Sequence, residues 1–250
     1  SEMCIRDSAK AKPDLFKQVS RWISIGEYLE LKLFGEAAVS YSVASWSGLL
    51  NRNLLIWDEP LISALPIRKD QLSPLVDSNI PRRGLRAEFT SRWPVLRDVP
   101  WFPASGDGAT ANIGSGCISP ERVALTVGTT SALRAVVDQP VHHIPPGLWC
   151  YRVDGRRSLP GGALSEGGSL FGWMTATLQF GSIQDLEQAL SKTKPDAHGL
   201  TILPFLSGER SPGWASHGRG TIHGLSFATT SFDIIKAGME SVAYRIAIVF

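Results

Sequence analysis

Cysteine is scarce in this sequence, and the few cysteines lie far apart. Cys4, Cys117 and Cys150 form no Cys-x-x-Cys pair and no group with the spacing of metal ligands. This excludes a disulfide-rich secreted scaffold and a finger-type zinc module. A reducing compartment suits such a chain, and we expect a cytoplasmic protein.

A strong charge of either sign is also missing. The chain has 25 Lys and Arg against 23 Asp and Glu, a net charge of +2, with no block of like charges. That balance gives no electrostatic basis for binding nucleic acid or an anionic membrane surface. No apolar run is long enough to cross a bilayer. We therefore expect neither nucleic acid nor a membrane as a partner.

The chain does have an ordinary globular composition with many glycines. Its 250 residues are 43% hydrophobic, which is enough for one large domain or parts of two. Many of the 24 glycines lie beside polar residues. These glycine-polar segments carry most of the functional information.

Both ends of the chain have unusual features. Residues 1–8, SEMCIRDS, resemble the translated end of a transposon adapter used in sequencing libraries, so the fold prediction starts at residue 9. Near the other end, Thr230 and Asp233 match a capping box before a helix. The apolar stripe of that helix is Ile235, Met239, Val242, Ile246 and Val249. Because the pattern reaches Phe250 without a Gly or Pro stop, we expect a gene fragment that continues on both sides.

Local patterns in the first half predict short elements. Ser24 and Glu27 form a capping box for a helix that Gly35 ends. The Ser-rich apolar segment 39–50 predicts a buried strand and turn. Residues 57–77 predict a short helix followed by a proline-broken connection.

From about residue 118 the pattern changes, so we place a domain boundary near Cys117. The segment 123–137, "VALTVGTTSALRAVV", alternates and predicts a β-hairpin with a hydroxyl-rich turn. Residues 161–178 are glycine-rich and then helical, and residues 182–190 predict a short amphipathic helix. Residues 203–214, "LPFLSGERSPGW", predict a buried strand that runs into a polar loop.

Three short segments combine glycine with an acid or hydroxyl: Gly106-Asp107-Gly108, Gly128-Thr129-Thr130 and Glu166-Gly167-Gly168. Glycine lets the backbone approach a ligand closely. Hydroxyl-rich turns and helix starts offer donors to phosphate oxygens, and an acid facing such a site can take a proton from an attacking hydroxyl. Together the segments predict phosphoryl transfer, although neither Gly-x-Gly-x-x-Gly nor the P-loop pattern is present.

The order of these segments resembles the FGGY carbohydrate kinases. The matching motifs are "GDGATANIGSGC", "LTVGTTSALR", "GGALSEGGSLFGW", "LPFLSGERSPGW" and "DIIKAGMESVAYR", with "SIGEYLELKLFGE" and "SVASWSGLL" before them. The resemblance runs from about residue 18 to the end. "GLWCYRVD", residues 147–154, is similar to a segment common in the gluconokinase-like branch.

This resemblance implies an α/β fold of the actin-like ATPase (ribonuclease H-like) class with two domains, incomplete at both ends. Residues 9–117 would be the C-terminal part of the N-terminal domain. Residues 118–250 would be the N-terminal part of the C-terminal domain. The first phosphate loop and the adenine-binding segment of the family are absent from the sequence, so we expect this chain alone to be inactive.

The resemblance also implies site residues, with ATP and Mg²⁺ as cofactors. Asp107 matches the catalytic aspartate that deprotonates the attacking sugar hydroxyl and lies near the metal. The Gly128-Thr129-Thr130 turn matches the phosphate turn of the second domain. Gly167 and Gly168 match the glycines that approach the nucleotide phosphates.

Each of these residues also has a purely structural interpretation. Asp107 could be a turn or N-cap aspartate, which glycine neighbours favour. Thr129 and Thr130 could be ordinary hairpin chemistry, and the glycine pair Gly167-Gly168 could be a tight strand-to-helix turn. The ordered motifs favour the functional interpretation of Asp107 and of the threonines, and leave the glycine pair open.

Other polar and aromatic residues are assigned mainly structural roles. Trp46 could stack on a sugar ring as part of the substrate site, but core packing is the preferred interpretation. Glu209 and Arg210 are interpreted as a structural loop pair. Solvated loop positions are expected for the histidines, which are His142, His143, His198, His217 and His223.

The leading functional hypothesis is an ATP-dependent kinase of an open-chain sugar or sugar acid, with gluconate first and a pentulose such as xylulose second. A catalytically dead sugar- or nucleotide-binding relative is the alternative from another class. A hydrolase is the third option, but the segment Gly224-Leu-Ser-Phe-Ala228 lacks the final glycine of a nucleophile elbow. The partner is expected to be a small sugar or sugar acid, and a homodimer is possible.

Overall fold

The computed structural model describes residues 2–250, and the chain divides into two compact units. The first unit contains the chain up to Arg122, with Ala135–His143 and Cys150–Pro160. The second unit contains Val123–Arg134, Ile144–Trp149 and Gly161–Phe250. The division into domains at Cys117 rests on sequence motifs and stays a prediction.

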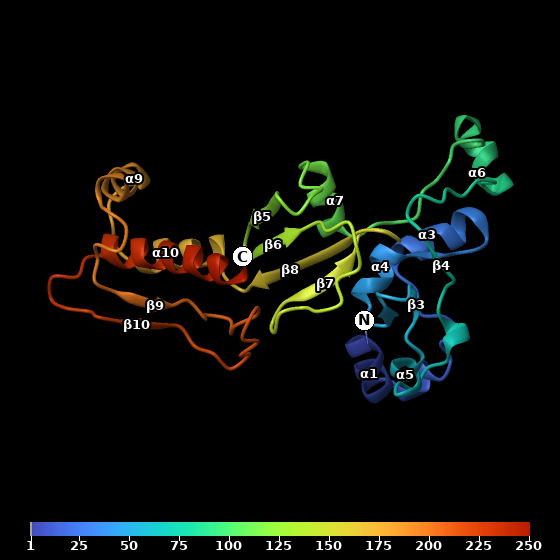
Figure 1. The fold of residues 1–250 in the computed structure, drawn as a ribbon, viewed down its shortest axis with the longest axis horizontal. Coiled ribbons are helices and arrows are strands. Elements are labelled where there is room, and N and C mark those ends of the chain that lie inside the picture. The colour runs from blue at the N-terminus through green and yellow to red at the C-terminus, as the bar shows by residue number, and fades with distance from the viewer. Residues whose placement is uncertain (1) are drawn as a thin grey trace. The chain divides into compact units, whose positions relative to one another are not determined.

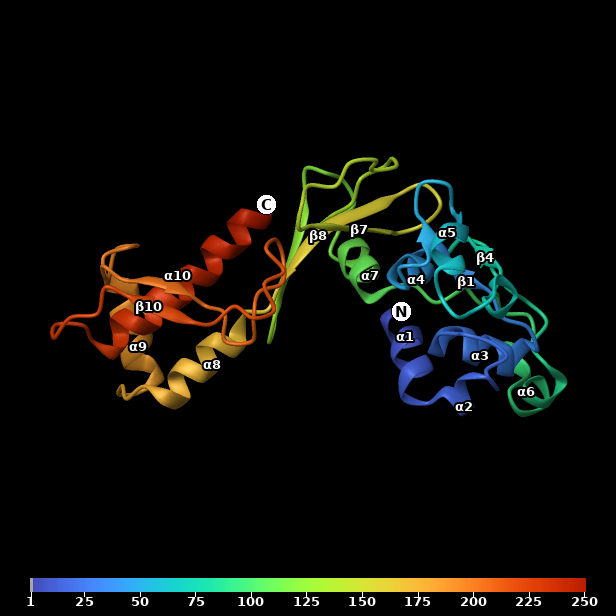
Figure 2. The same ribbon diagram turned by 90° about the horizontal axis from the view of Figure 1, so that it is seen from below.

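The first unit is mainly helical, with short strands (Figures 1 and 2). Its helices are α1 (Glu2–Ala11), α2 (Pro13–Phe16), α3 (Ile25–Phe34), α4 (Tyr41–Trp46), α5 (Glu59–Ser63), α6 (Ala87–Arg92) and α7 (Asp107–Gly114), with 3₁₀ turns at Lys69–Gln71 and Pro94–Leu96. Its short strands are β1 (Val39–Ser40), β2 (Leu50–Asn51), β3 (Ile56–Trp57) and β4 (Leu75–Val76). Strand β1 pairs in parallel with β4, and β2 pairs antiparallel with β3. The apolar core of this part includes Val39, Ala44, Leu49, Trp57 and Ile62.

The predicted capping box of α3 is confirmed. The Glu27 backbone N–H donates to Ser24 Oγ at 3.3 Å, and the Ser24 backbone N–H donates to Glu27 Oε2 at 2.7 Å. Gly35 ends the helix in the left-handed conformation with φ of 84°, which a side chain would disfavour.

The strand-and-turn prediction for residues 39–50 is wrong for its central part, which forms helix α4. Ser40 is the N-cap of α4, because its Oγ accepts a hydrogen bond from the Val43 backbone N–H at 3.1 Å. A serine of this kind satisfies a free amide of the first helical turn and so starts the helix. Only Val39–Ser40 and Leu50–Asn51 at the two ends are strands.

A four-stranded sheet has the order β5-β6-β8-β7. Its strands are β5 (Val123–Val127), β6 (Ser131–Ala135), β7 (Trp149–Arg152) and β8 (Ser158–Leu164). Strand β6 pairs antiparallel with β8, with Ser131 opposite Leu164 and Leu133 opposite Gly162. The adjacent strands β5 and β6, joined by the 128–130 turn, confirm the predicted hairpin.

The second unit also contains helices around a second core. They are α8 (Gly168–Thr177), α9 (Ile183–Lys192) and α10 (Ser231–Val249), and the strands are β9 (Thr201–Leu203) and β10 (Thr221–His223). Helix α10 packs against α8, α9 and β9 (Figures 1 and 2). The apolar residues at the centre of this packing are Leu170, Met174, Leu186, Ile235 and Val242.

The capping box of α10 is confirmed by the hydrogen bonds between Thr230 and Asp233. The predicted stripe is right except at Met239, which is 44% exposed. Gly238 takes the close-packed position instead, because a Cβ there would lie 2.6 Å from Met174 Cε. The predicted buried strand near Leu203 is also wrong, since β9 forms a two-stranded antiparallel sheet with β10 and Leu203 is 47% exposed. No helix in the described chain is long and apolar enough to span a membrane.

Candidate active site

Asp107 is the first residue of α7, and its side chain is exposed. The N-cap residue is Gly106, so the interpretation of Asp107 as an N-cap is wrong. Its carboxylate forms no hydrogen bond or ion pair with another residue of the described chain. Asp107 is therefore an available, negatively charged hydrogen-bond acceptor.

Helix α7 is fixed by the face opposite to Asp107. Ala109 and Asn112 are buried, at 2% and 0% exposure. Ala109 packs with Val153 and Leu159, which lie in or beside β7 and β8 (Figure 2). The packing of this buried face holds the start of α7. The position of Asp107 therefore rests on contacts with the rest of the unit and not on the stability of a short isolated helix.

A close contact with Trp46 fixes the loop immediately before Asp107. A Cβ at Gly106 would lie 2.6 Å from Trp46 Cε2, and closer still to Cζ2. Only glycine leaves space for the indole, although φ of −67° at Gly106 is ordinary for any residue. Glycine is thus needed here for space and not for backbone freedom.

Trp46 is a packing residue in this structure. Its ring centroid lies 5.9 Å from that of Tyr151, and its side is pressed against Gly106. The residue is 38% exposed. The preferred core-packing interpretation describes these contacts, and stacking on a sugar stays a prediction.

Two buried serines of the α4 segment hold the same loop. Ser40 Oγ donates to the Ala104 carbonyl at 2.6 Å, and Ser42 Oγ accepts from the Gly106 backbone N–H at 3.1 Å. Both serines are at most 1% exposed. The sequence motifs do not indicate these two serines, but a serine-rich apolar segment is a usable signal, because buried hydroxyls need hydrogen-bond partners.

The Gly128-Thr129-Thr130 turn is exposed and is clamped by the start of α8. The Gly168 backbone N–H donates to the Gly128 carbonyl at 2.7 Å, and the Ser169 backbone N–H donates to the Thr129 carbonyl at 3.2 Å. The Gly128 N–H also donates to the Thr130 carbonyl at 2.9 Å. The structure therefore brings the turn and the glycine pair together within one unit.

Gly167 makes the closest approach to the turn. A Cβ at Gly167 would lie 2.7 Å from the Gly128 carbonyl oxygen and 2.9 Å from the Thr130 carbonyl carbon. The first amides of α8 are engaged by the turn, so they are not free donors for a ligand. Gly167 and Gly168 therefore hold the 128–130 turn in place. The interpretation of the pair as a tight strand-to-helix turn does not predict these contacts.

The free hydrogen-bonding groups of the turn are its side chains. Thr129 and Thr130 are exposed, and neither hydroxyl bonds to another residue that the structure describes. Two outward hydroxyls on a braced turn are suitable donors for phosphate oxygens. The residues present thus fit a nucleotide phosphate, with the hydroxyls of Thr129 and Thr130 as the groups that would hold it.

The expected pairing of Glu209 with Arg210 is wrong. Glu209 forms an ion pair with Arg245 of α10, and the side chains of both are nearly buried. Arg245 Nη2 also donates to the Ser211 carbonyl at 2.9 Å, and its guanidinium lies 5.0 Å from the centroid of the Phe205 ring. The partner is 36 residues away in sequence, so the local pattern did not indicate it.

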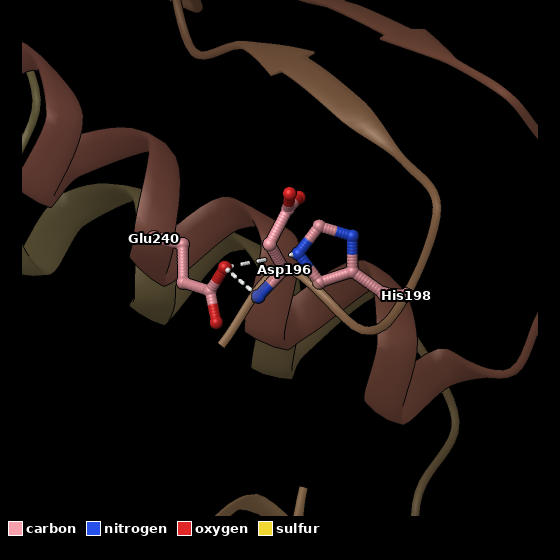
Figure 3. Close-up of side chains that lie close together, drawn as sticks. All are labelled: Asp196, His198 and Glu240. Atoms are coloured by element: carbon pink, nitrogen blue, oxygen red, sulfur yellow. Dashed lines mark hydrogen bonds and ion pairs between the residues drawn. The ribbon is translucent and has the colours of Figure 1, made fainter. Parts of the chain in front are cut away.

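His198 is likewise buried and not a solvated loop residue, since its side chain is only 3% exposed. Figure 3 shows it beside Asp196 and Glu240, three residues whose ligand atoms lie within 4.8 Å of one another. His198 Nε2 lies 3.2 Å from Glu240 Oε2, and the Asp196 backbone N–H donates to the same oxygen at 2.9 Å.

The hydrogen bonds of this group favour a structural role over metal binding. The Leu200 backbone N–H donates to His198 Nδ1 at 3.0 Å, so the ring proton is on Nε2, which donates to Glu240. A metal on Nε2 would move that proton to Nδ1, where it would face the Leu200 N–H. The ammonium of Lys236 lies 3.9 Å from Glu240 Oε1 and already balances the carboxylate. The group ties the loop before β9 to α10.

Comparison with known proteins decides the family. The model of the FGGY family of carbohydrate kinases, N-terminal domain, matches residues 8–114, and that of the C-terminal domain matches residues 123–250. The chain belongs to the FGGY family of carbohydrate kinases. The expected family and its two-domain actin-like ATPase fold are thereby confirmed.

Named relatives include sugar kinases of more than one specificity. The chain is 28% identical to a gluconokinase of Bacillus licheniformis over 95% of its own length, and 25% identical to a xylulose kinase of Escherichia coli (strain K12) over 94%. A gluconate kinase structure from Lactobacillus acidophilus matches with a TM-score of 0.90 at 28% identity, covering 99% of this chain and 51% of that one. A ligand-bound xylulose kinase from the same organism matches with a TM-score of 0.89 at 29% identity, covering 98% and 50%.

The chain spans about half the length of the curated relatives it matches, namely 48% of the gluconokinase and 49% of the xylulose kinase. The roles of Asp107, the turn and the glycine pair therefore enter as proposals. The structure supplies their environment: an exposed carboxylate at the start of α7 in one unit, and a hydroxyl-bearing turn held by α8 in the other.

Proposed function

We propose that the complete protein is an ATP-dependent kinase that phosphorylates a hydroxyl of a small sugar or sugar acid, with gluconate as the first candidate. The observation that carries the proposal is Asp107, an exposed carboxylate without a protein partner at the start of α7. An aspartate placed only for structure would cap the helix or pair with a cation, and Asp107 does neither.

Asp107 is assigned the role of general base. One of its carboxylate oxygens accepts the proton of the sugar hydroxyl as that oxygen attacks. The packing of Gly106 against Trp46 and the Ser42 hydrogen bond hold the backbone immediately before Asp107. General-base catalysis by a positioned side chain contributes roughly 10²–10⁴-fold in rate.

The hydroxyls of Thr129 and Thr130 are assigned to phosphate oxygens. ATP would supply the transferable phosphoryl group, and Mg²⁺ would supply positive charge that offsets the negative charge of the phosphates. Asp107 is proposed to lie near the metal. In phosphoryl transfer the protein contributes mainly positioning and electrostatic stabilisation. The support of the turn by Gly167 and Gly168 serves that purpose, because a mobile turn would place its hydroxyls poorly.

Gluconate is favoured over xylulose by the gluconokinase relatives and by the segment 147–154. Within that segment, Arg152 is only 2% exposed and donates to Ser158 Oγ at 3.0 Å and to the Asp154 carbonyl at 3.0 Å. These contacts lie within the protein, so Arg152 itself is not proposed as a sugar ligand, and the segment supports gluconate only by its resemblance. A xylulokinase-like activity is the second candidate.

The two other functional classes have less support. A catalytically dead relative would not need a free carboxylate at Asp107. For a hydrolase, Ser226 would need a base, but its Oγ lies 3.4 Å from Thr229 Oγ1 and accepts from the Ala228 backbone N–H at 3.2 Å. No histidine bonds to Ser226 in the part of the chain that the structure describes. The cytoplasmic location and a homodimer stay predictions.

The test is sugar-dependent ADP release by the full-length gene product, with gluconate, xylulose, ribulose and glycerol compared at equal concentration. We expect turnover with gluconate above the other three. Turnover with xylulose alone would replace the substrate and keep the reaction. ATP binding without turnover on any sugar would favour the dead relative instead. The 250-residue chain alone is expected to show no turnover.

A further inference from the structure

Glu166 is a buried carboxyl group that the proposed kinase chemistry does not use. It precedes the glycine pair at the start of α8 and is only 4% exposed. Neither of its two oxygens accepts a hydrogen bond from another residue in the described part of the chain. A buried carboxyl without a partner is costly, and such groups call for an explanation.

The carboxyl lines a small cavity within the second unit. The cavity has a volume of about 150 Å³ and is open to solvent. Its polar lining consists of Glu166 with Ser165, Ser169 and Ser207, and the rest is apolar, including Pro204. None of the three serine hydroxyls bonds to another residue that the structure describes. The polar side chains among the lining residues are therefore one carboxyl group and three hydroxyls, all of which offer oxygen as the ligand atom.

The charges around Glu166 do not balance when its carboxyl group is ionised. Arg245 of α10 and Glu209 of the 203–214 loop are the charged groups that act on it. Arg245 is already paired with Glu209, so an ionised Glu166 leaves one uncompensated negative charge. Burial raises the pKa of Glu166, its own backbone amide and Arg245 oppose that rise, and Glu209 adds to it. One positive charge is needed here, as a proton or as a cation.

We infer that this cavity is a site for one monovalent cation, K⁺ or Na⁺, bound by the Glu166 carboxylate and the serine hydroxyls. Hard cations take oxygen ligands, and a single added positive charge completes the balance with Glu209 and Arg245. Mg²⁺ suits the site less well, because it keeps most of its water, demands octahedral geometry and would be repelled by Arg245. The site adjoins Gly167 and Gly168 along the chain, and the inference does not depend on the proposed kinase activity.

A proton and a cation at Glu166 predict different responses to pH. Because the folded pKa is raised, the proton alone gives stability that is present below the unfolded pKa, about 4.3, and is lost as the pH rises through the folded value. A bound cation replaces the proton and restores that stability. The effect of the cation should therefore be larger at pH 8 than at pH 5.

The experiment measures thermal unfolding of the 250-residue chain in KCl, NaCl and tetramethylammonium chloride at equal ionic strength, at pH 5 and pH 8. We expect K⁺ or Na⁺ to raise Tm saturably at pH 8 by about 2–4 °C over tetramethylammonium, and by less at pH 5. Glu166→Gln should abolish that rise, and the matched control Glu187→Gln, at an exposed position of α9, should keep it.

Equal Tm in all three salts at pH 8, with a stability that falls as the pH rises, would overturn the proposal in favour of a bound proton. A response to MgCl₂ but not to K⁺ or Na⁺ would overturn the choice of a monovalent ion. If Glu166→Gln does not fold, Ser207→Ala gives the same test at an exposed position, and an undiminished response in that variant counts against the site. None of these readouts uses kinase activity, so their failure is separate from failure of the proposed function.

Discussion

Replacement of Gly106 by alanine tests how the loop before Asp107 is held. The added Cβ would lie 2.6 Å from Trp46 Cε2, whereas carbon atoms pack best at about 3.5–4.0 Å. Either the indole or the loop must therefore move by about 1 Å. The indole packs beside Tyr151, so moving either the indole or the loop disturbs existing contacts, and we expect destabilisation of about 1–3 kcal/mol, the usual range for overpacking.

Urea unfolding of the 250-residue chain measures this cost. The matched control is Gly114→Ala at the other end of α7, where an added Cβ meets no atom within 4 Å. Alanine is the better helix former, so this control should leave stability unchanged or raise it by up to about 1 kcal/mol. The opposite signs separate the Trp46 contact from any general effect of alanine in this helix.

A double-mutant cycle with Trp46→Leu tests whether the Trp46 indole is the group that clashes with the added Cβ. If the indole is the obstacle, Gly106→Ala should cost less in the Trp46→Leu background, with a coupling of about 0.5–3 kcal/mol. Equal stability of Gly106→Ala and Gly114→Ala, or an unchanged cost in the Trp46→Leu background, would refute the reasoning. In the full-length enzyme the same displacement should lower kcat by about 10²-fold, because a shift near 1 Å at a reacting group is enough to do so.

Three further predictions concern other parts of the chain. Gly167→Ala should lower the stability of the chain in urea unfolding and weaken ATP binding by the full-length protein in a titration, because the added Cβ would meet the backbone of the 128–130 turn. The control Gly172→Ala, where an added Cβ meets no atom within 4 Å, should do neither. Arg152→Ala should cost about 3 kcal/mol in urea unfolding, because it removes a buried guanidinium that serves Ser158 and Asp154; a cost below 1 kcal/mol would contradict a structural role. Hydrogen bonds from Thr230 lower the pKa of Asp233, so the ionised carboxylate should stabilise the folded state above the unfolded pKa of about 3.9. This stabilisation should be lost as the pH falls through the lower folded pKa. In urea unfolding, Thr230→Ala should therefore cost about 1 kcal/mol at pH 7 and less in acid.

Features set by short sequence patterns were predictable. The capping boxes of α3 and α10 each rest on two residues three positions apart, and both form as expected. The hairpin around residues 128–130 follows from strand alternation on both sides of a turn. The family could be recognised because its motifs are short, ordered and rich in glycine.

Features set by distant partners were not predictable from local patterns. Ser40 starts a helix where a strand was expected, because its hydroxyl both caps α4 and bonds to Ala104, 64 residues away. Glu209 pairs with Arg245, and His198 is buried against Glu240, through contacts made only after α10 packs. The supporting role of Gly167 likewise depends on the carbonyl of Gly128, which the sequence places 39 residues earlier.

The sequence predicts the residues of the candidate site but not their environment. Asp107 and the threonines were singled out by their glycine neighbours. The space that Gly106 leaves for Trp46, and the engagement of the α8 amides by the turn, appear only in three dimensions.

The most direct test of the proposed chemistry is the turnover of full-length Asp107→Asn with gluconate and ATP, both at saturating concentration. Asp98→Asn, an exposed aspartate of the same unit, is the matched control, and ATP binding shows that each variant is folded. We predict a kcat lowered by about 10²–10⁴-fold for Asp107→Asn and unchanged for Asp98→Asn. A kcat for Asp107→Asn within about threefold of wild type, far short of a general base's contribution, would contradict the central claim.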